Sequence, residues 1–187
     1  MRARHLTAAT TAALALAALT VPAATAAPAD ATPAAALPRC AEKNLTLRAE
    51  PTDDDGDVLR LSLRNDSGRA CLVDRVPIVT YGDLDGAAMP LPTVPHAGRT
   101  LAAHATAYAA VRSVTDFDEK EKDVRTVMSV TVSAVPEHHG STFQALTLGA
   151  PTGVRVWSPV TTLWQSSQKE AATVLEEQTT GRSQYAT

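Results

Sequence analysis

The clearest pattern along the chain is an alternation of apolar and polar residues in the runs 44–50 and 58–64. Side chains of a β-strand point alternately to its two faces, so this alternation predicts two strands that each bury one face. The segment Pro51–Gly56, with the sequence PTDDDG, separates the runs and has the composition of a turn. We therefore expect a hairpin whose apolar face is formed by Leu45, Leu47, Ala49, Leu59, Leu61 and Leu63.

Turn residues then interrupt the chain at intervals of about ten residues, beginning with Asn65–Gly68. Short strands at this spacing predict an all-β fold, an immunoglobulin-like antiparallel β-sandwich of about seven to nine strands. The further strands are expected at 71–73, 78–81, 105–114, 124–135, 143–148 and 154–157.

Three segments complete the prediction of the fold. Asp83–Gly86 has the residues of a hairpin turn. The three prolines between residues 89 and 96 indicate an irregular crossing or an edge strand. Ser167–Glu170 fits a helix capping box and precedes apolar residues at helical spacing, which predicts one short C-terminal helix with a frayed end from Gly181.

The first 26 residues have the three parts of a secretory signal peptide: a basic start, an apolar run from Leu6 to Val21, and small residues at the cleavage position. The run is shorter than the roughly 20 residues that span a membrane, which argues against an anchor. Residues 27–39 are rich in Ala and Pro and lack periodicity, as in a disordered linker. We expect a secreted, extracellular protein with its β-sandwich domain at 40–165 and a helix and tail at 166–187.

Charge narrows the range of partners. Removal of Arg2 and Arg4 with the signal peptide leaves 15 basic residues against 20 acidic ones, and hence a net charge of −5. A negative protein is repelled by nucleic acid and by anionic membrane surfaces. We therefore expect neither as a partner after signal cleavage, but an unknown extracellular protein or cell-wall component.

Cys40 and Cys71 are the two cysteines, and both lie after the signal peptide. An even number of cysteines in an exported chain favours a disulfide. The loop of about 30 residues that it would close predicts a stabilisation of roughly 3–4 kcal/mol. The alternative is a pair of buried free thiols.

Candidate metal and catalytic groups lack the spacing that their chemistry needs. The acidic run Asp53–Asp57 suggests calcium, but the EF-hand register fails because Pro51 and Ser62 would occupy the first and last ligand positions. His138 and His139 are adjacent and would need outside ligands to hold zinc or copper. The sequence has no Gly-x-Ser-x-Gly nucleophile motif. The acidic run is expected to be a solvated hairpin turn, and a weak calcium site at the tip of the sandwich is the alternative. We otherwise expect no metal, no cofactor and no catalytic residue.

Trp157 and Trp164 are the candidate ligand-binding residues. Trp157 ends a strand-like Val-Arg-Val-Trp run, so it is expected in the core or at its rim. Trp164 lies outside the strand pattern, so its ring is more readily exposed than that of Trp157. An exposed indole ring can stack on a sugar ring. Tyr81 and Tyr108 are expected in the core with hydrogen-bonded hydroxyl groups.

The chain resembles the domain of unknown function 4232 family of secreted actinobacterial proteins over residues 40–162. The resemblance is carried by the runs LSLRNDSGRAC, VPIVTYGDLDG, GRTLAAHATAYAAV and GVRVWSPVT, and above all by the turn from Asn65 to Cys71. It implies an immunoglobulin-like β-sandwich with the two early cysteines bonded, and it assigns no activity. Many members have Gly-Tyr-Pro where Arg75-Val76-Pro77 stands here, and many carry further cysteines.

These observations favour a secreted, non-catalytic β-sandwich domain that acts as a binding or interaction module. The first alternative is a cell-wall carbohydrate-binding module that uses Trp157 or Trp164. Exposure of either ring in a groove would favour it, and burial of both would exclude it. The second alternative, a small secreted hydrolase or metalloenzyme, would need His138 or His104 beside a carboxylate in a pocket.

Overall fold

The computed structural model describes residues 36–52, 56–93, 98–115 and 123–183, all within one unit of the chain that begins at Ala36. The strands are β1 (Leu45–Pro51), β2 (Val58–Asn65), β3 (Cys71–Asp74), β4 (Ile78–Tyr81), β5 (Met89–Leu91), β6 (Gly98–Leu101), β7 (Thr106–Arg112), β8 (Arg125–Val127), β9 (Ser129–Ser133), β10 (Ser141–Gln144), β11 (Val154–Val156) and β12 (Val160–Thr162). The helices are the 3-10 turns η1 (Glu42–Asn44) and η2 (Ala145–Leu148) and the α-helix α1 (Gln168–Ser183).

The predicted hairpin is present as β1 and β2. The two strands are antiparallel, with Leu47 opposite Leu63 and Ala49 opposite Leu61. The leucines of β2 are almost fully buried, while those of β1, at the sheet edge, are half-buried. The alternation therefore predicted both the pairing and the buried face.

A five-stranded sheet in the order β1-β2-β7-β12-β5 is the main layer. Strand β7 is the alanine-rich stretch, and it buries small residues on both faces. Ala107, Ala109 and Val111 face the main core, whereas Ala110 packs under α1 with Ala171 and Leu175. A strand covered on both faces has no need of polar alternation, which is why the sequence of this segment shows little of it.

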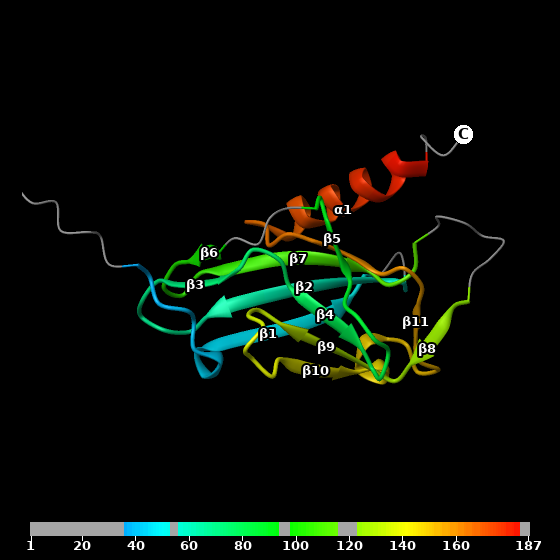
Figure 1. Cartoon of the computed structure of the whole chain (residues 1–187), viewed down its shortest axis with the longest axis horizontal. Helices are drawn as coiled ribbons and strands as arrows, with labels where there is room; N and C mark the ends of the chain where they lie inside the picture. Colours follow the sequence, from blue (N-terminus) through cyan, green and yellow to red (C-terminus); the bar gives the residue numbers. More distant parts are fainter. Residues whose placement is uncertain (1–35, 53–55, 94–97, 116–122, 184–187) are drawn as a thin grey trace, which may run out of the picture. The chain divides into compact units, whose positions relative to one another are not determined.

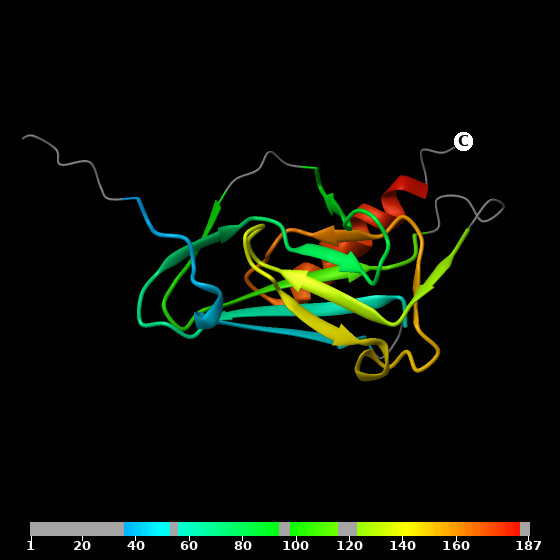
Figure 2. The same cartoon turned by 60° about the horizontal axis from the view of Figure 1, so that its bottom comes forward.

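Figure 1 shows α1 on one side of β7 and β2, and β9 and β10 on the other. The second layer contains a three-stranded sheet in the order β10-β9-β4, which Figure 2 brings forward. Two further pairs, β11 with β8 and β3 with β6, complete the strands. Valines of β4 and β9 meet the leucines of β2 in one core, so the predicted all-β sandwich with a C-terminal helix is confirmed.

Two details of the sandwich differ from the prediction. The described residues contain more strands than expected, and β12 pairs with β5 in parallel. The turn Asp83–Gly86 does not form a hairpin, because it leads from β4 in the three-stranded sheet to β5 in the five-stranded one. Turn residues specify a local reversal of the chain but not which sheet edge the next strand joins.

The segment 124–135 forms two strands and not one. Val127 and Val130 are both buried, yet they are three residues apart, so an unbroken strand would place them on opposite faces. The chain breaks at the exposed Met128, and β8 pairs with β11 while β9 pairs with β10 and β4.

The predicted strand 143–148 is also wrong in its second half. β10 ends at Gln144, and Ala145–Leu148 forms the 3-10 turn η2. Its buried residues, Ala145 and Leu148, are three apart, which is the period of a 3-10 helix. Gly149 ends the turn with a φ of 73°, a conformation that glycine adopts readily.

The helix α1 begins as its sequence indicates. The Ser167 hydroxyl accepts the backbone N–H of Glu170 at 3.1 Å. The Glu170 carboxylate accepts the backbone N–H of Ser166 at 3.2 Å, one residue earlier than in a standard capping box. The helix continues through Gly181 to Ser183, beyond the expected frayed end.

No helix of the described residues is long and apolar enough to cross a membrane.

Candidate ligand-binding site

A pocket of about 310 Å³ opens beside Trp157, and we call it the Trp157 pocket. Three parts of the chain form it: the turn that follows β4, the start of β8, and the segment that joins β11 to β12. Its volume lies at the lower end of the range for small-molecule sites. Its lining residues are Tyr81, Leu84, Asp85, Gly86, Ala87, Asp123, Arg125, Val156, Trp157, Ser158 and Pro159.

Backbone hydrogen bonds hold the wall that carries Trp157. The Trp157 N–H donates to the Ser113 carbonyl at 2.8 Å, and the Trp157 carbonyl accepts the N–H of Thr115 at 3.1 Å. The Thr115 hydroxyl donates to the Ser158 carbonyl at 2.9 Å. Ser158 has a φ of 44°, a left-handed conformation that is uncommon for a non-glycine residue. Such a conformation persists only where the surroundings impose it, so the Trp157 wall is a rigid feature.

Tyr81 lines the pocket and is only 2% exposed. Its hydroxyl is buried, and within the described part of the chain no group forms a hydrogen bond with it. Burial raises the pKa of this hydroxyl above its ordinary value, so it stays protonated and can donate. The expected burial is correct, but the expected protein partner is missing. A buried hydroxyl without a partner costs free energy, which a polar ligand atom would recover.

Three charged residues line the mouth of the pocket. Arg125 and Asp123 form an ion pair at 3.7 Å between Nη1 and Oδ2, and their side chains are 62% and 79% exposed. Asp85, on the opposite turn, is also exposed. Exposed ion pairs are weak and exchange easily with water or a ligand. These groups can therefore donate and accept hydrogen bonds to a ligand that lies on the Trp157 ring.

Of the two predicted ligand-binding residues, Trp157 lines this pocket and is half-buried. Trp164 is 1% exposed and belongs to the main core. After β12 the chain stays extended and pairs again with β7, since Gln165 and Tyr108 exchange backbone hydrogen bonds at 2.6 and 3.0 Å. This second pairing, which the sequence pattern did not reveal, fixes Trp164 inside. The expected exposure of Trp164 is therefore wrong, and the residue belongs to the core.

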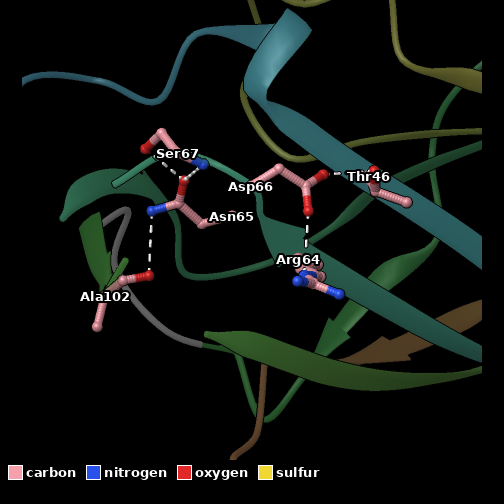
Figure 3. Close-up of polar contacts among 6 residues, drawn as sticks. All are labelled: Thr46, Arg64, Asn65, Asp66, Ser67 and Ala102. Atoms are coloured by element: carbon pink, nitrogen blue, oxygen red, sulfur yellow. Dashed lines mark hydrogen bonds and ion pairs between the residues drawn. The ribbon is translucent and has the colours of Figure 1, made fainter. Parts of the chain in front are cut away.

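The turn from Asn65 to Cys71, the most specific motif of the sequence, has a structural role (Figure 3). Asn65 is fully buried, and its amide donates to the carbonyls of Arg69 at 2.8 Å and Ala102 at 3.0 Å. Its side-chain oxygen accepts the hydroxyl of Ser67 at 2.7 Å. The Asp66 carboxylate accepts the hydroxyl of Thr46 in β1 and pairs with the guanidinium of Arg64 in β2. The motif thus fastens the loop that leads from β2 to β3.

The two cysteines close the same region. Cys40 and Cys71 form a disulfide, as predicted. The Cys40 N–H also donates to the Leu72 carbonyl at 2.9 Å, and the Leu72 N–H donates to the Pro38 carbonyl at 2.8 Å. The start of the domain is therefore attached to β3 by covalent and hydrogen bonds together.

The remaining candidate groups lie apart from the Trp157 pocket. His139 is 98% exposed and lies 3.5 Å from the Glu42 carboxylate. His104 is exposed. In the acidic run, the Arg155 Nε donates to the Asp57 carboxylate at 3.3 Å. Residues 53–55 of this run lie outside the described ranges. His96 also lies outside them. Within the described residues, no group of three or more acidic, histidine or cysteine side chains could hold a metal ion.

The sequence did not single out most of the residues that line the pocket. Tyr81 was predicted only as a core residue. Asp85, Asp123 and Arg125 come from separate parts of the chain, and their order along it carries no motif. Only the Asp-Gly step at Asp85 marked a turn, and that signal concerns the backbone. The fold alone brings them to Trp157.

Comparison with known proteins identifies the fold family. The family model "Domain of unknown function (DUF4232)" matches residues 40–165, which is more than half of the chain. A search of curated proteins found no match. A search of solved structures found none either. With this match over its β-sandwich, the chain belongs to the DUF4232 family.

Proposed function

We propose that this chain is a secreted, non-catalytic binding domain whose ligand occupies the Trp157 pocket. One observation carries the proposal: a half-buried indole, next to a left-handed residue, lines the same pocket as Tyr81, whose buried hydroxyl has no hydrogen-bond partner among the described residues. Rigid aromatic surface beside a few fixed polar groups is the usual composition of a small-molecule site.

Two features support an extracellular location. The first 26 residues have the pattern of a signal peptide. The disulfide between Cys40 and Cys71 fits an oxidising compartment, because such bonds are rare in the reducing cytosol. An extracellular partner is therefore the reasonable expectation.

The character of the lining groups favours binding over catalysis. Asp85 and Asp123 are exposed carboxylates. General acids and bases in enzymes are usually tuned by burial or by close charges in a water-excluded site. The serine that lines the pocket, Ser158, is also exposed. Its backbone carbonyl accepts a hydrogen bond from the Thr115 hydroxyl.

The second candidate function is recognition of a cell-wall carbohydrate, and Trp157 favours it. A sugar presents an apolar ring face and a periphery of hydroxyl groups. The indole could take the ring face, while Arg125, Asp123, Asp85 and the Tyr81 hydroxyl could bind the periphery. Burial of Trp164 leaves Trp157 as the one predicted ring that can serve in this way.

Binding of the secreted protein to purified cell-wall polysaccharide fractions, measured by calorimetry, tests this proposal. We expect saturable binding that falls at least about tenfold in Trp157→Ala and less in Trp157→Phe, because an aromatic anchor is worth about 1.5 kcal/mol or more. Leu146→Ala is the matched control, since Leu146 is 72% exposed and does not line the pocket. Equal affinity of Trp157→Ala and the wild type would reject the site, and release of a cleaved product would reject the non-catalytic role.

The variant Tyr81→Phe separates ligand contact from folding. Removal of a buried hydroxyl that has no hydrogen-bond partner in the described part of the chain should leave stability unchanged or raise it by about 1 kcal/mol. If the hydroxyl binds the ligand, affinity should fall about fivefold in the same variant. Loss of stability together with unchanged affinity would show that the hydroxyl is a structural group.

A further inference from the structure

A second pocket, also of about 310 Å³, adjoins the segment between β4 and β5, and we call it the edge pocket. It lies beside β4 and β5, each of which is the outermost strand of its sheet. It shares only Ala87 with the Trp157 pocket. Its lining residues are Asp74, Arg75, Val76, Pro77, Ile78, Ala87, Ala88, Pro90, Thr93 and Pro136.

Most of this lining is aliphatic. Val76 and Ile78 are half-buried, and Pro77 and Ala88 are buried. Pro90 and Pro136 complete the apolar wall, and Thr93 adds a hydroxyl. Burial of an alkyl group here would remove apolar surface from water on both partners.

The two charged residues of the edge pocket differ in whether an ion-pair partner is present. The Asp74 carboxylate is paired with the guanidinium of Arg39, which raises the pKa of Arg39. Arg75 is exposed, and among the described residues no carboxylate lies within ion-pair distance of its guanidinium. Its backbone is fixed, since the Arg75 carbonyl accepts the N–H of Trp164 at 3.0 Å. The pocket therefore combines apolar walls with one available positive charge.

The backbone at the pocket argues against an added peptide strand. A β-strand needs free N–H and C=O groups along the edge that it joins. The Ala88 N–H donates to the Val79 carbonyl and the Met89 N–H to the Pro159 carbonyl, both at 2.8 Å. Pro90 has no N–H. A ligand held by apolar contact and one ion pair fits this wall better than a strand does.

We propose that the edge pocket binds a small amphiphilic carboxylate, a short alkyl chain that ends in a carboxylate group. The alkyl chain lies between Val76, Ile78 and the prolines, and the carboxylate binds the Arg75 guanidinium. This inference is independent of the function proposed for the Trp157 pocket.

The experiment is a calorimetric titration of the secreted protein with hexanoate, octanoate and decanoate, below the concentrations at which they form micelles. Each added methylene should raise the affinity about fourfold until the pocket is full, and the affinity should then level off. Octanol is the neutral comparison. It should bind about fivefold more weakly than octanoate, because it lacks the ion pair.

Arg75→Gln should weaken octanoate binding about fivefold and leave octanol binding unchanged. Arg69→Gln is the matched control, an exposed arginine on the loop before β3 that does not line the edge pocket. Val76→Trp should block the pocket for every chain length, with the circular dichroism spectrum and the disulfide verifying its fold. If that variant does not fold, Arg75→Gln still decides the proposal.

Several outcomes would overturn this inference. They are the absence of saturable octanoate binding to the wild type, an equal octanoate affinity in Arg75→Gln, and an affinity that rises without levelling off. Loss of octanoate binding in Trp157→Ala but not in Arg75→Gln would place the ligand in the other pocket and would equally reject the proposal.

Discussion

Asn65 shows how much one buried side chain can hold in this fold. It lies at the end of β2. Its amide donates to the carbonyl of Arg69 in the loop before β3 and, at 3.2 Å, to the carbonyl of Leu101 at the end of β6. Buried polar groups are tolerated only when they are hydrogen-bonded, and this one is bonded at both its nitrogen and its oxygen.

Replacement of Asn65 by Ala should lower the free energy of unfolding by about 3 kcal/mol, because it leaves buried carbonyls without a donor. Urea denaturation measures the loss. Asn44→Ala is the matched control at the same end of the hairpin, just before β1, and it should change stability by less than about 1 kcal/mol. Equal effects of the two variants would contradict the role given to Asn65.

Glu42 provides a prediction about pH. Its carboxylate accepts the N–H of Gly140 at 2.7 Å, and this bond is the main reason why the pKa of Glu42 is lowered. A lowered pKa contributes stability above the unfolded value of about 4.3, and this contribution disappears as the pH falls through the folded value. The stability difference between wild type and Glu42→Gln should therefore shrink between pH 6 and pH 3 in denaturation experiments. A stability difference that stays constant over this pH range would contradict a stabilising role for the Glu42 carboxylate.

Among the elements, α1 makes the outer face of the main sheet a second core. Ala171 and Leu175 pack on Ala110 of β7, Val160 of β12 and Val58 of β2. The helix is otherwise polar, with exposed glutamates on its outer side. Its attachment to the sheet therefore depends on a few apolar side chains.

Leu175→Ala should cost about 2–4 kcal/mol, because Leu175 is 2% exposed and its truncation leaves a cavity under the helix. Ala172→Gly is a useful comparison, since Ala172 is exposed on the same helix and should cost only about 1 kcal/mol. Both values come from thermal and urea unfolding. A cost below that of Ala172→Gly would show that α1 is not packed on the sheet.

The elements also show where sequence patterns succeed and fail. Alternation predicted the β1–β2 hairpin because one face of each strand is buried and the other is exposed. The pattern failed at Met128 and at Ala145–Leu148, where burial follows a spacing of three residues. It failed at Trp164 because a second pairing with β7, remote in sequence, determines its burial. Long-range contacts of this kind leave no local signal.

At the scale of the molecule, one disulfide secures the start of the domain against β3. Cys40 and Cys71 are 31 residues apart in sequence, and the double variant with alanine at both positions should lose about 3–4 kcal/mol of stability. Reduction of the wild type should give a similar loss in urea denaturation. A loss below about 1 kcal/mol would mean that β3 and β6 hold this end without the bond.

The Trp157 pocket is also a property of the whole molecule. Tyr81 comes from one sheet, Arg125 from another, and Trp157 from the segment that leads to a third. The sequence could nominate Trp157 by residue type, but the hydroxyl and charges around it appear only once the sheets are packed.

The most direct test of this account uses the fluorescence of the two tryptophans separately. Trp164→Phe leaves Trp157 as the only indole, and Trp157→Phe leaves Trp164. Both variants are titrated with a cell-wall polysaccharide fraction. We predict a saturable change in emission when Trp157 is present and no change when only the buried Trp164 remains. A saturable change from Trp164 alone, or no change from Trp157 with any fraction, would contradict it.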